Sequence, residues 1–211
     1  MQHSTFRNLK NLLKSTQLGG AEDQKLMVPS ERRVLTPKQA VLDEAKKAAV
    51  LALFYPNKNG ETCLVLTLRP NYSGTHSAQV SFPGGKHEKE DTDLKETALR
   101  ETFEEIGIEP TEIETIREIT DVYIPPSNFL VTPYIGIAKN KLEFIKNHEV
   151  EKIIEVPLKN ILDDSFVFLN TKHPHSSKKT QVPYFNFDNH MVWGATAIII
   201  SEIKELLKRL I

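Results

Sequence analysis

Apolar runs of strand length alternate with helical segments along most of this chain, without an internal repeat. Two runs, AAVLALFYP (48–56) and TCLVLTLRP (62–70), flank a PNKNGE turn and predict a pair of β-strands. Further strands are predicted at 79–83, 120–125, 131–138, 152–158 and 182–187, and helices at 93–106, 158–164 and 193–210. This alternation predicts an α/β fold in which helices cover both faces of a mixed sheet.

The N-terminal part of the chain lacks this pattern. We predict a helical arm and linker over residues 1–45 and one folded domain over 46–211. Within the first part, residues 21–45 are polar and contain Pro29 and Pro37, which predicts a linker that ends in a short helix. The first twenty residues contain no acidic side chain and have apolar residues at helical spacing (Phe6, Leu9, Leu13). An organelle transit peptide has these properties, but Gly19-Gly20 equally suits the end of a helix docked on the domain, which is the interpretation we favour.

Charge and cysteine content exclude several classes of protein. The 27 Lys and Arg residues nearly balance the 28 Asp and Glu residues, so bulk charge does not favour a nucleic acid or an anionic membrane as partner. Cys63 is the only cysteine, which excludes an intramolecular disulfide and a cysteine-rich zinc site. No apolar stretch approaches the ~20 residues of a membrane span. We therefore expect a soluble, cytoplasmic protein.

The helix predicted at 93–106 has well-marked ends. Asp93 is a favourable N-cap residue, and Glu96 follows it at the spacing of a capping box. Gly107 suits the left-handed position that follows a helix C-terminus. These signals fix the register in which the side chains of this helix can be assigned to faces.

Three glutamates are expected to share one face of this helix. At about 100° per residue, Glu105 falls about 40° to one side of Glu101 and Glu104 about 60° to the other. Apolar residues are expected on the opposite face (Leu99, Phe103, Ile106). An acidic triplet is often only a solvated surface. Here, however, the helix follows Gly84-Gly85, whose backbone can approach the carboxylates and add hard oxygen ligands for Mg²⁺ or Mn²⁺.

A site of this kind suits the cleavage of a phosphoanhydride. Divalent ions neutralise diphosphate oxygens, orient the substrate and acidify the attacking water, while a carboxylate that is not bound to metal removes its proton. Hydrolysis of a phosphate monoester or simple metal storage would use similar ligands. The carboxylates alone therefore leave the reaction open.

Residues 84–108 resemble the Nudix box. Its pattern is Gly, five residues, Glu, seven residues, and then Arg-Glu-hydrophobic-x-Glu-Glu-x-Gly-hydrophobic. The second half matches RETFEEIGI (100–108), with Thr102 in place of the usual aliphatic residue. In the first half Asp91 stands at the early Glu position, and eight residues rather than seven separate it from Arg100.

The resemblance implies a Nudix α/β/α sandwich with Mg²⁺ or Mn²⁺ as cofactor. Glu101 and Glu105 would be metal ligands, Glu104 a ligand or the general base, and the Gly85 carbonyl would lie nearby. Nudix enzymes commonly recruit a further glutamate from outside the box as base or extra ligand. Two glutamates, Glu149 and Glu151, precede the strand predicted at 152–158, and we rank Glu149 first.

The segment upstream of the box is similar to the coenzyme A pyrophosphatase branch of the Nudix family. LTLRPNYSGTHSAQVSFPGGK (66–86) follows the motif Leu-Thr-x-Arg-Ser, spacer, His-x-Gly-Gln-Val-Ser-Phe-Pro-Gly-Gly, with Pro70 and Ala78 as departures. The similarity extends from about Ala48 to the C-terminus. It implies substrate contacts from Arg69, His76, Gln79, Ser81 and Phe82. Without it, an ion pair for Arg69 and a loop hydrogen bond for His76 would be the ordinary roles.

The resemblance implies hydrolysis of the diphosphate in coenzyme A or acyl-coenzyme A to 3′,5′-ADP and 4′-phosphopantetheine or its acyl form. One alternative is a Nudix hydrolase of another nucleoside diphosphate derivative, such as ADP-ribose or a dinucleotide. The other is a non-catalytic nucleotide-binding module, which would be free to lose the glutamate triplet that this chain retains. A homodimer is left open.

Overall fold

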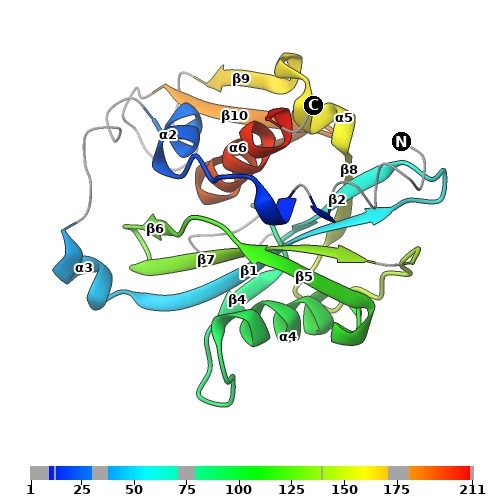
Figure 1. Ribbon diagram of the computed structural model, residues 1–211, viewed down its shortest axis with the longest axis horizontal. Helices are drawn as coiled ribbons and strands as arrows, with labels where there is room; N and C mark the ends of the chain where they lie inside the picture. Colours follow the sequence, from blue (N-terminus) through cyan, green and yellow to red (C-terminus); the bar gives the residue numbers. More distant parts are fainter. Residues whose placement is uncertain are drawn as a thin grey trace.

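A mixed β-sheet forms the centre of the fold (Figure 1). The computed structural model describes residues 10–11, 13–29, 38–70, 79–138, 140–170 and 181–209. Within these residues the sheet has eight strands. Strand β1 (Lys46–Pro56) pairs in parallel with β7 (Phe129–Ala138) and antiparallel with β2 (Thr62–Leu68). The mixed α/β architecture predicted from the alternation of elements is therefore confirmed.

The shorter strands of this sheet extend it around β1, β2 and β7. They are β3 (Val80–Ser81), β4 (Gly84–Lys86), β5 (Ile113–Glu118), β6 (Val122–Ile124) and β8 (Lys152–Pro157). Strands β3 and β8 pair with β2, β4 pairs with the first half of β1, and β5 and β6 pair with β7. The segment that carries Gly84 and Gly85 therefore lies alongside the central strand.

Helices cover both faces of the sheet (Figure 1). They include α4 (Leu94–Ile106) on one face and α6 (Gly194–Lys208) on the other, with α5 (Leu158–Leu162) next to α6. Side chains of β1 alternate between the two layers, as strand geometry requires. Leu51 and Leu53 pack in the core on the α4 side, and Ala52 and Phe54 pack in the core on the α6 side. Among the described residues, no helix combines the length and hydropathy needed to cross a membrane.

A small antiparallel sheet lies beyond α6. It consists of β9 (Val167–Asn170), β10 (Val182–Phe187) and β11 (His190–Val192). Phe185 and Phe187 of β10 belong to the core on the α6 side. The helix α6 is therefore packed between two sheets, which explains why most of its residues are buried, including the polar Ser201 and the charged Glu202 and Lys204.

The described part of the N-terminal region packs on α6. Leu13 and Met27 are buried in the α6-side core. The segment from α2 (Ala21–Gln24) through the 3₁₀ turn η1 (Lys25–Met27) contacts α6 directly, although residues 21–45 were expected to be a linker. The short helix expected at the end of that linker is present as α3 (Gln39–Asp43).

The side chain of Gln24 donates a hydrogen bond to the fully buried carboxylate of Glu202. Its Nε2 donates to Glu202 Oε2 at 2.9 Å and to the Thr120 carbonyl at 3.0 Å, and Glu202 is 0% exposed. We expect Gln24→Ala to lower the free energy of unfolding by about 2 kcal/mol, because a hydrogen bond to a buried charged group is lost. The matched control is Lys25→Ala, which breaks an exposed ion pair with Glu22 and should cost at most about 0.5 kcal/mol. Urea denaturation measures both; equal stabilities of Gln24→Ala and the unmodified chain would contradict the prediction.

Candidate functional site

Helix α4, which carries the predicted metal ligands, begins and ends where the sequence indicates. Asp93 is the N-cap, and its Oδ1 accepts a hydrogen bond from the Glu96 amide at 2.7 Å. The Glu96 carboxylate accepts from the Thr92 amide at 2.6 Å, so the reciprocal bond is displaced by one residue from a standard capping box. Gly107 ends the helix with φ of 74°. The helix register used to assign faces is therefore correct.

The buried face of α4 differs from the prediction at two positions. Phe103, expected on the apolar face, is 43% exposed, whereas Glu105 is only 4% exposed. The other buried residues of the helix are mostly small (Thr97, Ala98, Thr102, Ile106). The buried arc is therefore rotated toward the glutamates, and the carboxylate of Glu105 lies inside the protein rather than on a solvated surface.

The two glycines of β4 leave space for the carboxylates of α4. A Cβ atom at Gly85 would lie 2.4 to 2.5 Å from the carboxylate atoms of Glu101. The Gly84 amide donates to Glu105 Oε2 at 3.3 Å. Gly84 has φ of 149°, and a Cβ atom there would collide with the Ala49 carbonyl. The Gly-Gly pair thus permits the close approach of backbone and carboxylates that the sequence suggested.

The buried carboxylates of Glu101 and Glu105 are only partly compensated by the positive charges of Arg69 and Arg100. Desolvation raises the pKa of Glu105 to about 8, although the positive charge of Arg69 opposes the shift. Desolvation also raises the pKa of Glu101, and Arg100 opposes it. The negative charge of Glu149 contributes to both increases. Buried carboxylate oxygens next to a glycine backbone are a donor set that fits a hard divalent cation, which would supply the missing positive charge.

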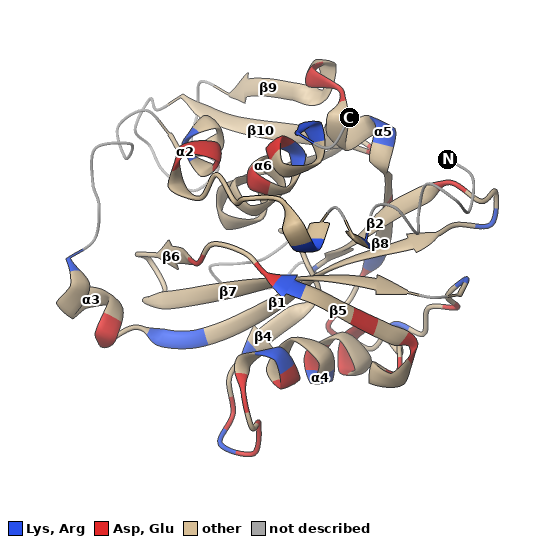
Figure 2. Cartoon of the chain, viewed as in Figure 1, with Lys and Arg blue, Asp and Glu red and all other residues tan. Residues whose placement is uncertain are grey.

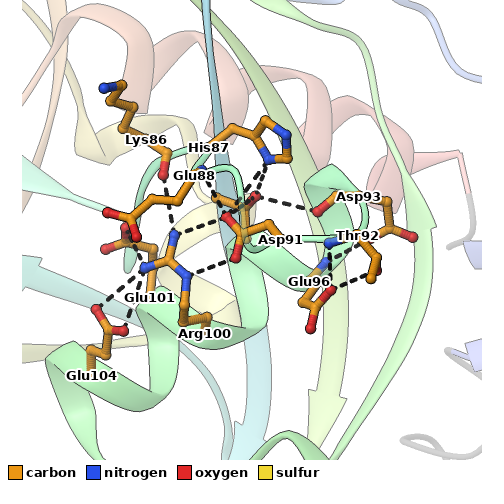
Figure 3. A network of polar contacts seen from close by, with 11 residues as sticks. Lys86, His87, Glu88, Asp91, Thr92, Asp93, Glu96, Arg100, Glu101 and Glu104 are labelled. Atoms are coloured by element: carbon orange, nitrogen blue, oxygen red, sulfur yellow. Dashed lines mark hydrogen bonds and ion pairs between the residues drawn. The ribbon is translucent and has the colours of Figure 1, made fainter.

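Arg100 forms ion pairs with two of the predicted metal ligands, Glu101 and Glu104 (Figure 3). Its Nη1 lies 3.0 Å from Glu101 Oε1 and 3.3 Å from Glu104 Oε2. Among the residues that the structure describes, no three metal-ligating side chains converge on one point. Glu104 is exposed, so its side chain can turn away from Arg100 when a cation binds. In this structure, the carboxylates of Glu101 and Glu104 are therefore paired with the Arg100 guanidinium and do not yet surround a common metal position.

Asp91 anchors Arg100 from the opposite side (Figure 3). The Asp91 carboxylate accepts from Arg100 Nε at 2.8 Å and from Nη2 at 3.0 Å, and also from Thr97 Oγ1 and the Glu88 amide. The guanidinium holds the pKa of Asp91 well below its usual range. The early acidic residue of the box, despite its shifted spacing, therefore orients Arg100, for which no role was predicted.

Two of the predicted substrate residues lie side by side. The Arg69 amide donates to the Gln79 carbonyl at 3.0 Å, where β2 ends and β3 begins. The Arg69 guanidinium is 3.8 Å from Glu149 Oε2, and both side chains are partly exposed. The structure therefore brings Arg69 and Glu149 together within electrostatic reach of Glu105, and Gln79 is paired with the Arg69 backbone.

The other predicted substrate residues have different surroundings. Ser81 pairs with Thr67 across β2 and β3, with 3.3 Å between their hydroxyl oxygens. Phe82 is 2% exposed and belongs to the core on the α6 side, opposite the α4 layer. The structure thus gives Phe82 a packing role in the larger core, and its contribution to substrate binding stays a prediction. His76 lies outside the described residues.

Charge on the molecule as a whole is mixed, in agreement with its near-neutral composition. Acidic and basic residues are interspersed over the elements and occur together along α4 (Figure 2). The local accumulation of carboxylates at Glu101, Glu105 and Glu149 is therefore a property of the site and not of the surface in general.

Comparison with known proteins agrees with this architecture. The NUDIX domain family model matches residues 45–172. The chain is 34% identical over 162 residues to "Nudix hydrolase 15, mitochondrial" of Arabidopsis thaliana, a match that covers 74% of this chain and 56% of that protein. It is 30% identical over 171 residues to "Uncharacterized Nudix hydrolase NudL" of Photorhabdus laumondii, which covers 80% of this chain and 89% of that protein.

Solved structures are similar in fold at low sequence identity. A Nudix hydrolase from M. smegmatis, RenU, aligns with a TM-score of 0.54 at 16% identity over 79% of this chain and 88% of that one. The MutT protein of Methanosarcina mazei Go1 aligns with a TM-score of 0.50 at 18% identity over 79% and 98%. The chain spans about half the length of the Arabidopsis relatives it matches, 56% and 53%. The family model over residues 45–172 and the relatives at 30% identity or more show that the chain belongs to the Nudix family.

Proposed function

We propose that this protein hydrolyses the diphosphate bond of a nucleoside diphosphate derivative with Mg²⁺ or Mn²⁺ as cofactor. The observation that carries the proposal is the burial of Glu105 with a raised pKa beside Glu101 and the Gly-Gly strand β4. A buried carboxylate without full compensation is costly for folding alone. A bound cation would offset the cost of burying this carboxylate, and its positive charge would also act on the diphosphate of the substrate.

The residues divide into three roles. Glu101, Glu105 and the Gly85 carbonyl would hold the cation, with Glu104 as a further ligand. When bound, the cation neutralises diphosphate oxygens and acidifies the attacking water. The oxygen of that water forms a bond to one phosphorus atom while Glu149 accepts the proton that the water loses. The bond from this phosphorus to the bridging oxygen breaks, and the bridging oxygen leaves with the other phosphate. Arg69 binds a phosphate oxygen pair through its planar guanidinium.

Glu149 is the first candidate for the general base. Arg100 already engages Glu104 and Glu101, whereas the Glu149 carboxylate, within the described part of the chain, pairs only with Arg69, at 3.8 Å. A phosphate that binds Arg69 would compete for that guanidinium and release Glu149 toward the water. Glu104 is the second candidate, because its exposed carboxylate can rotate without disturbing the helix.

Coenzyme A or acyl-coenzyme A is the substrate that we propose. The similarity of residues 66–86 to the coenzyme A pyrophosphatase branch supports this choice. The placement of Gln79 beside Arg69, directly before strand β3 and a few residues before the Gly-Gly pair of β4, is compatible with it, because the substrate and metal motifs are then consecutive in the chain. Another nucleoside diphosphate derivative, such as ADP-ribose, is the second candidate.

The test is product analysis across four compounds. The purified protein is incubated with coenzyme A, acetyl-coenzyme A, ADP-ribose or NADH, with Mn²⁺ or with EDTA, and the products are separated by chromatography. We expect 3′,5′-ADP and 4′-phosphopantetheine from coenzyme A only when Mn²⁺ is present. Intact coenzyme A beside rapid cleavage of ADP-ribose would overturn the substrate. Binding without turnover of any compound would overturn the hydrolase and favour a binding module.

A further inference from the structure

The loop that carries Glu149 is attached to the end of helix α4. This loop, residues 140–151, precedes strand β8 and has no regular secondary structure. The Ile145 amide donates to the Ile106 carbonyl at 2.9 Å, and the Asn147 amide donates to the Glu105 carbonyl at 3.1 Å. Carbonyls in the last turn of a helix have no partner within the helix. The loop therefore takes its position from the helix that carries the proposed metal ligands.

Asn147 makes a second hydrogen bond, through its side chain. Its Oδ1 accepts from the Glu149 amide at 2.8 Å. One residue thus connects the backbone of Glu105, through its own amide, to the backbone of Glu149, through its carboxamide. The path from the proposed ligand to the proposed base contains only two hydrogen bonds.

The far side of Glu149 is also fixed. Val150 is buried in the α4-side core, and the Glu151 amide donates to the Leu68 carbonyl at 2.8 Å, one residue before Arg69. The Glu149 side chain itself is 51% exposed, and among the residues that the structure describes its carboxylate pairs only with the Arg69 guanidinium, at 3.8 Å. Because this contact is long, the position of the carboxylate depends on the backbone of Glu149.

A general base must lie within hydrogen-bond distance of its water, and a displacement of about 1 Å can cost about 100-fold in rate. We infer that Asn147 is a positioning residue that sets the distance between Glu149 and the metal-binding carboxylates. This inference rests on the proposed function, in which Glu149 is the base. Asn147 touches neither substrate nor cation; it acts through the main chain of Glu149.

Hydrogen exchange tests whether Asn147 fixes the backbone of the loop that carries Glu149, and this test does not require enzymatic activity. Amide exchange of the peptide spanning residues 142–152 is compared among the unmodified chain, Asn147→Ala, Asn147→Asp and Ile145→Ala. Asn147→Asp keeps the side-chain acceptor. Ile145→Ala is the matched control, because it removes an exposed side chain and keeps the backbone hydrogen bond. We expect faster exchange only in Asn147→Ala, and unchanged exchange in that variant would overturn the inference.

Kinetics test the functional part. With saturating Mn²⁺ and the substrate that is cleaved fastest, Asn147→Ala should lower kcat by about 10- to 100-fold with little change in KM. Asn147→Asp should restore kcat, and Asn147→Ala should cost nothing further when combined with Glu149→Gln. Full activity of Asn147→Ala beside an impaired Glu149→Gln would overturn the positioning role and leave the proposed function intact. Full activity of Glu149→Gln would instead overturn Glu149 as base, and with it the role of Asn147.

Discussion

Replacing Glu105 with glutamine is expected to remove metal-dependent hydrolysis and to stabilise the metal-free protein at the same time. Glutamine retains the size of the side chain but supplies no charge to a divalent cation. A metal ion stabilises the charge of the transition state by several kcal/mol, so loss of its main buried ligand should lower kcat by about 1,000-fold or more. The assay is Mn²⁺-dependent hydrolysis of the preferred substrate. Activity close to that of the unmodified enzyme would show that Glu105 is not an essential ligand.

The stability part of this prediction has a defined pH dependence. Burial raises the pKa of Glu105 from 4.5 to about 8, so folding of the metal-free protein takes up a proton between these values. Stability from this group is present below about pH 4.5 and is lost as the pH rises to about 8, with about 1.4 kcal/mol for each pKa unit. Glutamine cannot ionise. Glu105→Gln should therefore match the unmodified chain near pH 5 and be more stable at pH 8.

Urea denaturation in EDTA at the two pH values measures this difference. Glu104→Gln is the matched control, since Glu104 is on the same helix but exposed, and this variant should keep the loss of stability that the burial of Glu105 causes. An identical loss of stability with pH in Glu105→Gln and the unmodified chain would contradict the uncompensated burial of this carboxylate.

Gly85→Ala is the second change with a large expected effect. The new Cβ atom would lie 2.4 to 2.5 Å from the Glu101 carboxylate, so this carboxylate must move away from its position beside β4. The backbone at Gly85 is not in the left-handed region, and the expected damage is therefore steric. We expect a loss of turnover of about 100-fold or more from the misplaced ligand and a loss of stability of about 1 to 3 kcal/mol.

The double variant Gly85→Ala with Glu101→Ala separates these two effects. Removing the Glu101 side chain relieves the collision, so the stability should recover while turnover stays low. Full turnover of Gly85→Ala alone would show that Glu101 does not need its place beside Gly85.

The sequence predicted best those elements whose signals are local. The bounds of α4 follow from Asp93 and Gly107, whose capping roles need no tertiary partner. Strands β1, β2 and β7 were predicted because they are long and apolar. Four short strands were missed, β4, β5, β9 and β11. Strand β4 has two glycines and no apolar residue. Strand β5 has its apolar residues three positions apart, at Ile113 and Ile116, instead of in the alternation typical of a strand, so both strands depend on pairing with a longer strand.

The sequence predicted which glutamates share a face of α4, but not how deeply each of them is buried. The helical wheel placed Glu101, Glu104 and Glu105 together, yet it could not show which of them the sheet would cover. That outcome depends on the closeness of α4 to the glycine strand β4, which is a tertiary contact. Asn147 gives no signal in the sequence for the same reason, because its partners are a helix terminus and a loop amide.

The most direct test of a cation site at Glu105 is a titration with Mn²⁺ at pH 8, followed by urea denaturation. A ligand that binds only the folded state raises the free energy of unfolding with its concentration. We predict that Mn²⁺ stabilises the unmodified chain and abolishes its loss of stability between pH 5 and pH 8, whereas Glu105→Gln responds weakly or not at all. Equal stabilisation of both proteins by Mn²⁺ would contradict the assignment of Glu105 as the buried ligand around which this site is built.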